Sequence, residues 1–189
     1  MSNWNARTLV RVAMFTALMS VAAYIQVPLP PVAISLQTLV ALLAGLVLGQ
    51  RFGPLSILVY LGVGLVGIPV FTSGGGISYL LKPSFGYLIG FIPAAWLVGF
   101  ITKNPKGLSM SQMLLLAIGA HLVIYAIGVP YLYIALKNFS GVPVSLAFIL
   151  KTGFLIILPG DLLKSVFFMV VAPRINRLHT IRAFREFCQ

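Results

Sequence analysis

Acidic side chains are almost absent from this sequence. The 189 residues contain 2 Asp+Glu against 13 Lys+Arg, and only 8% of them are charged, whereas an ordinary soluble domain carries about 25%. A water-exposed surface cannot be built from so few charges. Because 60% of the residues are hydrophobic and the mean hydropathy is +1.06, the composition predicts an all-α integral membrane protein.

Cysteine and nucleotide-binding motifs are scarce as well. The single cysteine, Cys188, excludes an internal disulfide or a cysteine-ligated metal cluster. No G-x-x-x-x-G-K-[ST] motif occurs, so the chain has no evident means of using ATP itself. Asp161 is the only carboxylate in the apolar region, which excludes a paired-acid mechanism or a two-metal site. We therefore expect no catalysis, metal or cofactor, although an intramembrane enzyme using Asp161 alone stays an alternative.

Long apolar runs fill the chain. A transmembrane helix needs roughly 20 apolar residues, so this length holds about six spans in a single domain, residues 1–189, without a separate soluble domain. The predicted spans are 8–27, 34–49, 54–70, 83–102, 111–136 and 159–175. Residues 144–157 are predicted as a short helix or a partly buried loop, and one long kinked helix through Pro159 and Gly160 is the alternative.

Basic residues lie between the apolar runs, which argues against nucleic acid as a partner and for the positive-inside rule. With six spans, three basic residues face one side: Lys82, Lys137 and Lys151. Nine face the other side: Arg7, Arg11, Arg51, Lys103, Lys106, Arg174, Arg177, Arg182 and Arg185. The imbalance predicts a cell-membrane protein with both termini in the cytoplasm and a basic tail near anionic lipid.

The segment Leu158-Pro159-Gly160-Asp161-Leu162-Leu163-Lys164 carries the strongest functional signal. A charged side chain at bilayer depth is unfavourable by about 3 kcal/mol or more, so such residues usually mark function. Asp161 and Lys164 are three residues apart and share a helix face. A helix start with an internal salt bridge would also explain Asp161, but Lys164 lies one turn deeper among leucines, and we favour a ligand site.

Two outward loops and the first span hold weaker signals. Gly75 and Gly76 belong to a glycine run that suits either a mobile lid or a plain flexible turn. Gln37 and Thr38 are expected to face the bundle interior, where hydrogen bonding between helices is the simpler explanation. In the first span Ala13 and Ala17 form a smooth strip for close helix packing, within this chain or with a partner. His121 is expected to be a packed or hydrogen-bonded residue and not a ligand.

Three segments together resemble the BioY family, the biotin-specific S components of energy-coupling factor (ECF) transporters. These segments are the first outward loop with Gln37-Thr38-Leu39, the run Pro83-Ser84-Phe85-Gly86-Tyr87-Leu88-Ile89-Gly90-Phe91, and Leu158 to Lys164. The similarity extends from the first span to about Arg174. Phe85 departs from the pattern, since family members often carry glycine there.

The resemblance implies a six-helix S-component fold with a biotin pocket near the outer face, covered by the first and third loops. It also implies a transmembrane coupling subunit, facing Ala13 and Ala17, and two cytoplasmic ATPases. Asp161 and Lys164 match the polar pair of the family's last helix. We expect Lys164 to meet the carboxylate of biotin with help from Lys82, and Asp161 to accept ureido N–H groups or orient Lys164.

Further residues expected at the biotin site are Tyr87, Tyr79, Gln37, Gly75 and Gly76. Two readings stay open beside biotin uptake with an ATPase module. One is an S component for another vitamin, and the other is a biotin transporter that works without the ATPases.

Overall fold

The computed structural model describes residues 5–103, 108–139 and 145–180, so Lys106, Arg182, Arg185 and Cys188 lie outside the described residues. The helices are α1 (Ala6–Tyr24), α2 (Gln37–Leu65), α3 (Phe85–Ile101), α4 (Met110–Phe139), α5 (Leu146–Leu150) and α6 (Leu158–Thr180). Two short strands, β1 (Gln26–Val27) and β2 (Ile34–Ser35), a 3₁₀ helix (Ile77–Leu81) and a π-helical turn (Lys151–Leu155) complete the elements.

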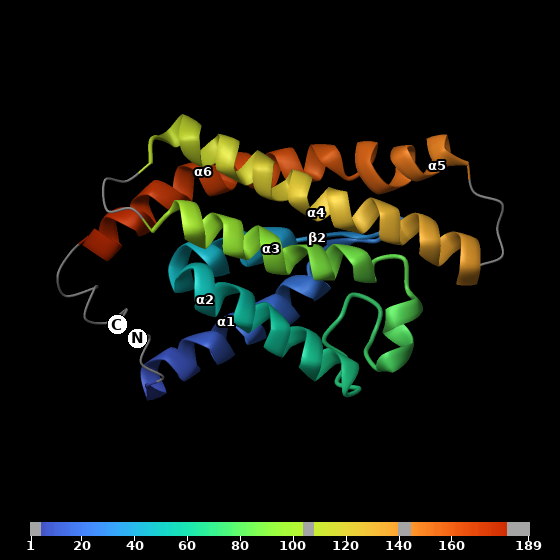
Figure 1. Cartoon of the computed structure of the whole chain (residues 1–189), viewed down its shortest axis with the longest axis horizontal. Helices are drawn as coiled ribbons and strands as arrows, with labels where there is room; N and C mark the ends of the chain where they lie inside the picture. The colour runs from blue at the N-terminus through green and yellow to red at the C-terminus, as the bar shows by residue number, and fades with distance from the viewer. Residues whose placement is uncertain (1–4, 104–107, 140–144, 181–189) are drawn as a thin grey trace.

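The helices form an elongated bundle. Helix α3 packs between α2 and α4, α1 packs against α2, and α6 packs against α4 and α2. The beginning of α1 and the end of α6 lie at the same end of the bundle, and α5 lies at the opposite end (Figure 1). The first and last described helices therefore begin and end on one side of the bundle, and the membrane face to which that side belongs stays a prediction.

Helix α2 is interrupted at Gly49, where the backbone is non-helical with φ 76° and ψ −177°. The two arms on either side fold back on each other. A Cβ built on Gly53 would lie 2.8 Å from the Cα of Gly45, and Gln37 at the start of the first arm reaches Tyr60 near the end of the second. The sequence predicts two spans here, 34–49 and 54–70. In the structure two helical arms between Gln37 and Leu65 meet at Gly49, whose backbone conformation only glycine adopts without strain.

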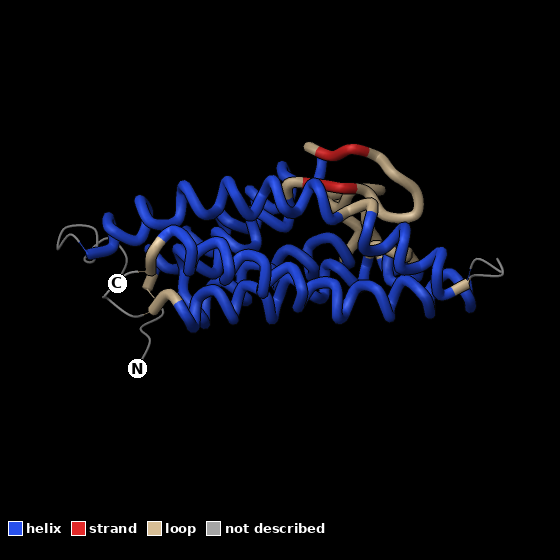
Figure 2. Tube along the Cα trace, turned by 90° about the horizontal axis from the view of Figure 1, so that it is seen from above, coloured by secondary structure: helices blue, strands red, loops and turns tan. Residues whose placement is uncertain are grey.

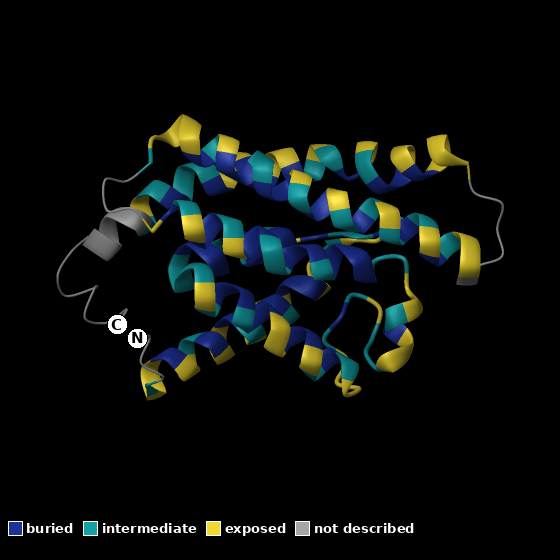
Figure 3. Cartoon of the chain, in the orientation of Figure 1, coloured by how far each residue is buried: buried dark blue, intermediate teal, exposed yellow. Residues whose placement is uncertain are grey.

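Among the described residues, four helical segments are long and apolar enough to cross a membrane: Ala6–Tyr24, Gln37–Leu65, Met110–Asn138 and Leu146–Ile175. Helix α3 is apolar but shorter. Many large apolar side chains are exposed on the helices, and exposed and buried residues alternate along each helix (Figure 3). The prediction of an all-helical membrane protein is confirmed at this level, and the number of six crossings remains a prediction.

Residues 144–157 are described from Ser145 onward. They contain the short helix α5, followed by the π-helical turn that leads into α6. Thr152 and Gly153 of the turn are buried against the bundle. π-helical turns often occur at functional sites. Here the turn directs the backbone carbonyl of Gly153 toward Tyr87 inside the bundle.

Two segments cover one face of the bundle. The strands β1 and β2 pair antiparallel as a hairpin that projects from the helices (Figure 2). Residues 66–84, called the covering loop below, contain the 3₁₀ helix and a bridge between Phe71 and Gly74. Phe71 is fully buried, and a Cβ on Gly64 would lie 2.1 Å from its ring, so glycine at position 64 gives that ring its space.

Candidate ligand-binding site

A small cavity of about 40 Å³ lies beneath the hairpin and the covering loop. Its wall combines polar groups with aromatic and aliphatic side chains, as small-molecule sites usually do. The lining residues are Val32, Ala33, Ile34, Ser35, Gln37, Thr38, Thr72, Tyr79, Ser84, Tyr87, Leu88, Phe91, Ile124, Ile157, Asp161 and Lys164.

The first turns of α6 supply both charged residues of the cavity. Asp161 is 2% exposed and Lys164 is 7% exposed. Gly160 brings this helix start close to the hairpin, because a Cβ there would lie 2.9 Å from the Ile34 side chain. The Pro-Gly-Asp sequence thus begins the helix, allows the close contact, and places the acid where the helix dipole favours it.

Lys164 makes one ion pair and two hydrogen bonds through its ammonium group. Its Nζ lies 2.5 Å from Oδ1 of Asp161. It donates to the backbone carbonyl of Ser35 at 2.8 Å and to Oγ1 of Thr38 at 2.7 Å. The ammonium group therefore joins α6 to β2 and to the first turn of α2, and the buried charge pair as a whole is neutral.

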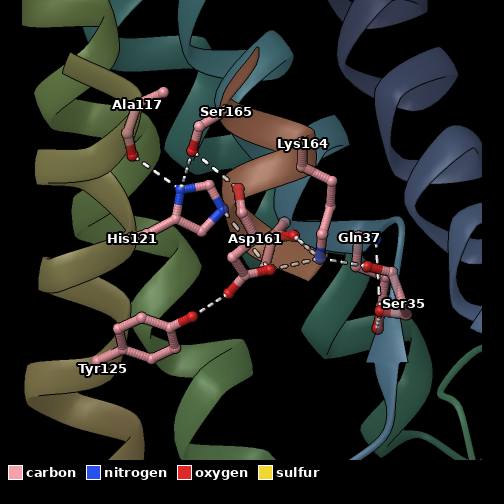
Figure 4. A network of polar contacts seen from close by, with 9 residues as sticks. Ser35, Gln37, Ala117, His121, Tyr125, Asp161, Lys164 and Ser165 are labelled. Atoms are coloured by element: carbon pink, nitrogen blue, oxygen red, sulfur yellow. Dashed lines mark hydrogen bonds and ion pairs between the residues drawn. The ribbon is translucent and has the colours of Figure 1, made fainter. Parts of the chain in front are cut away.

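The other carboxylate oxygen of Asp161 faces α4. The hydroxyl of Tyr125 donates to Oδ2 at 2.5 Å, and Nε2 of His121 lies 3.7 Å from Oδ1. Figure 4 shows Asp161 between these two residues on one side and Lys164 on the other. The Nδ1 atom of His121 forms a hydrogen bond with the carbonyl of Ala117 at 2.8 Å, which fixes the ring to its own helix.

Hydroxyl and amide groups complete the polar lining. Gln37 donates from Nε2 to the hydroxyl of Tyr60 at 2.6 Å, and Tyr60 donates to the carbonyl of Val70 in the covering loop at 2.9 Å. Tyr87 donates to the carbonyl of Gly153 in the π-helical turn at 2.8 Å. The hydroxyl of Tyr79 lies 2.8 Å from that of Thr72.

The sequence matches the profile of the BioY family over residues 1–180. The chain belongs to the BioY family.

Several relatives and one solved structure are similar to this BioY-family chain over most of its length. The probable biotin transporter BioY of Lysinibacillus sphaericus is 41% identical over 171 residues, which is 90% of this chain and 87% of that protein. The biotin transporter BioY of Thermotoga maritima is 34% identical over 93% of this chain and 99% of that protein. A crystal structure of the S-component for biotin from an ECF-type ABC transporter has a TM-score of 0.70 and 27% identity, with each chain covered completely. The family is one of transporter S components, not of enzymes.

Five of the residues predicted for the pocket of this BioY-family chain line the cavity: Asp161, Lys164, Tyr87, Tyr79 and Gln37.

Three others do not line it. Gly75 and Gly76 pack the covering loop onto the end of α2, since the N–H of Gly76 donates to the carbonyl of Gly64 at 2.7 Å. Lys82 is exposed, two residues before the cavity-lining Ser84. All three residues lie in the covering loop.

Ala13 and Ala17 are both exposed on α1. They share their surface with the exposed apolar side chains of Val10, Met14 and Val21. This face of α1 is available to lipid or to another protein.

Sequence reasoning missed Ser35 and Tyr125. Ser35 accepts a hydrogen bond from Lys164 through its backbone carbonyl. Every residue type has such a carbonyl, so the sequence does not indicate this contact. Tyr125 stands four residues after His121, so the two share a helix face, and this spacing is the one signal that could have pointed to a polar partner for the buried acid.

Proposed function

We propose that this chain is the substrate-capture subunit of an ECF-type importer and binds biotin in the cavity beneath the hairpin. The observation that carries the proposal is the buried, neutral Asp161–Lys164 pair in a cavity lined by aromatic and hydroxyl groups. The relatives called biotin transporters and the solved biotin S-component support the choice of ligand.

The neutral pair suits the ureido group of biotin better than its carboxylate. A ureido group offers two N–H donors and one carbonyl acceptor without net charge. An Asp carboxylate beside a Lys ammonium presents the complementary acceptor and donor. A ligand carboxylate at the same place would instead leave two buried anions sharing one cation, which is unfavourable. We therefore revise our expectation for Lys164 and assign it to the ureido carbonyl.

The carboxylate tail of biotin is then assigned to the rim of the cavity, where Lys82 is exposed to solvent. Tyr79 and Tyr87 flank the apolar ring system, and Gln37 holds the start of α2 beneath it. Gly75 and Gly76 act indirectly by letting the covering loop pack closely on α2. Because the cavity is small, biotin reaches it only when the hairpin or the covering loop moves away.

We propose that the chain crosses the membrane six times, with each arm of α2 counted as one crossing, and that both termini lie in the cytoplasm. The exposed strip with Ala13 and Ala17 docks on the coupling subunit, because small side chains allow close approach of another helix. Two cytoplasmic ATPases supply the energy for release.

Binding of labelled biotin to the detergent-purified chain tests the proposal, with riboflavin and thiamine as competitors. Tight binding that neither competitor displaces is the expected result. Displacement by another vitamin would favour an S component of different specificity, and no binding by a folded chain would overturn the biotin assignment. Uptake in cells lacking the coupling subunit and ATPases would identify a transporter that works alone.

A further inference from the structure

Tyr125 of α4 contacts the charged pair without belonging to the cavity wall. Its hydroxyl donates to Oδ2 of Asp161 at 2.5 Å, its side chain is buried at 5% exposure, and it is not among the residues that line the cavity. In this structure the hydroxyl of Tyr125 therefore contacts Asp161 and does not line the cavity.

The orientation of the Asp161 carboxylate decides what the cavity offers. The terminal torsion of an aspartate is broad and does not fix the carboxylate plane by itself. In this structure Oδ2 is turned to Tyr125 and Oδ1 to Lys164. A hydrogen bond to a charged acceptor is worth more than one between neutral groups, so the Tyr125 hydroxyl is a strong restraint on that torsion.

The position of Tyr125 is itself restrained by the π-helical turn. The ring of Phe154 packs edge-on against the Tyr125 ring, with centroids 5.0 Å apart and planes at 79°. The neighbouring Gly153 offers its carbonyl to Tyr87. One irregular turn thus supports a tyrosine behind the acid and another in the cavity wall.

We propose that Tyr125 is a positioning residue for ligand binding, whose hydroxyl holds the Asp161 carboxylate so that Oδ1 stays on Lys164 and faces the cavity. This inference rests on the proposed function and adds to it a residue that does not touch the ligand. It predicts that Tyr125 and Asp161 act as one unit.

A double-mutant cycle tests the inference. Biotin affinity is measured for the wild type, Tyr125→Phe, Asp161→Ala and the double variant, with Tyr133→Phe on the same helix as the matched control. The phenylalanine keeps the packing on Phe154 and removes only the hydroxyl. The expected result is a loss of about tenfold or more for Tyr125→Phe, shrinking to about twofold or less once Asp161 is alanine, with Tyr133→Phe close to wild type.

Wild-type affinity in Tyr125→Phe, or an equal loss in both backgrounds, would overturn the inference. If Asp161→Ala binds too weakly to measure, the cycle is read from the Tm values of the four ligand-free proteins, where additive shifts overturn the pairing and non-additive shifts support it. If the folded wild type does not bind biotin, the proposed function is wrong, and this result says nothing about Tyr125. The Tm cycle then decides separately whether Tyr125 and Asp161 are coupled.

Discussion

The floor and the cover of the cavity are built in different ways. The floor (Gln37, Thr38, Asp161 and Lys164) consists of buried polar side chains from two helices, and Lys164 alone makes one ion pair and two hydrogen bonds. The covering loop is held largely through its backbone. The N–H of Gly76 donates to the carbonyl of Gly64. The hydroxyl of Tyr24 in α1 donates to the carbonyl of Pro69, and that of Tyr131 in α4 donates to the carbonyl of Leu80. We infer that the floor sets which ligand binds, and the cover sets how long it stays.

The largest expected effect comes from breaking the charge pair of the floor. Lys164→Ala leaves the buried carboxylate of Asp161 without its cation, a change worth about 3–5 kcal/mol in buried pairs. We expect biotin affinity to fall by about 100-fold or more and Tm to fall with it. Equilibrium binding measures the effect, and Lys151→Ala, which removes an exposed lysine, is the control. Wild-type affinity in Lys164→Ala would contradict the assignment of this residue.

A smaller effect is expected from crowding the cover. A Cβ at Gly75 would lie 2.3 Å from the carbonyl oxygen of Ile68, so the loop must shift, and overpacking of this kind is unfavourable by about 1–3 kcal/mol. We expect Gly75→Ala to lower biotin affinity about tenfold and to reduce Tm by a few degrees. Gly62→Ala is the matched control, because no atom lies within 4 Å of its added methyl group. Equal behaviour of the two variants would show that the covering loop does not shape the site.

Removing one tyrosine hydroxyl from the cover should change rates more than selectivity. Tyr131→Phe deletes the donor to the carbonyl of Leu80, a neutral hydrogen bond worth about 0.5–1.5 kcal/mol. We expect biotin to dissociate about threefold faster, with the order of preference among vitamins unchanged. Stopped-flow exchange of labelled biotin gives the rate. A change in vitamin preference would mean that the cover also selects the ligand.

The smallest effect on binding is expected at Ala17, far from both regions. Ala17→Trp should leave biotin affinity of the isolated chain within about twofold, because the side chain is exposed on α1. Uptake in cells with the coupling subunit and ATPases should be lost, since the bulky ring blocks close helix approach. Leu115→Trp, at another exposed apolar position, controls for general damage. Normal uptake by Ala17→Trp would remove this strip from the proposed interface.

Much of the floor could be predicted from the sequence because ionised residues in an apolar helix are unfavourable and stand out. Asp161 and Lys164 were found in this way, and they do line the cavity. Lys82 and the two glycines were harder to place, since a loop sequence gives composition but not the direction in which the backbone folds. Their effect depends on Gly64 and Ile68, which no pattern in the sequence connects to them.

The reversal in α2 shows a similar limit. Gln50 and Arg51 break the apolar run and predict a turn near this point, but the turn needs only the positive φ of Gly49. The two helical arms meet at Gly49 without a separate connecting loop, so the break lies at this residue and not over residues 50–53. Tyr125 was missed for a different reason, because a tyrosine in an apolar helix is ordinarily a packing residue.

The contacts of Lys164 have a thermodynamic consequence. Its ammonium already makes an ion pair and two hydrogen bonds, so an arriving carbonyl that replaces the Ser35 or Thr38 oxygen leaves the number of hydrogen bonds almost constant. The polar exchange then contributes little net free energy, and the gain comes from removing the apolar rings of the ligand from water. Calorimetry should therefore give a clearly negative heat-capacity change for ligand binding. In this account the charged pair determines which ligands fit, and the burial of apolar surface provides most of the binding free energy.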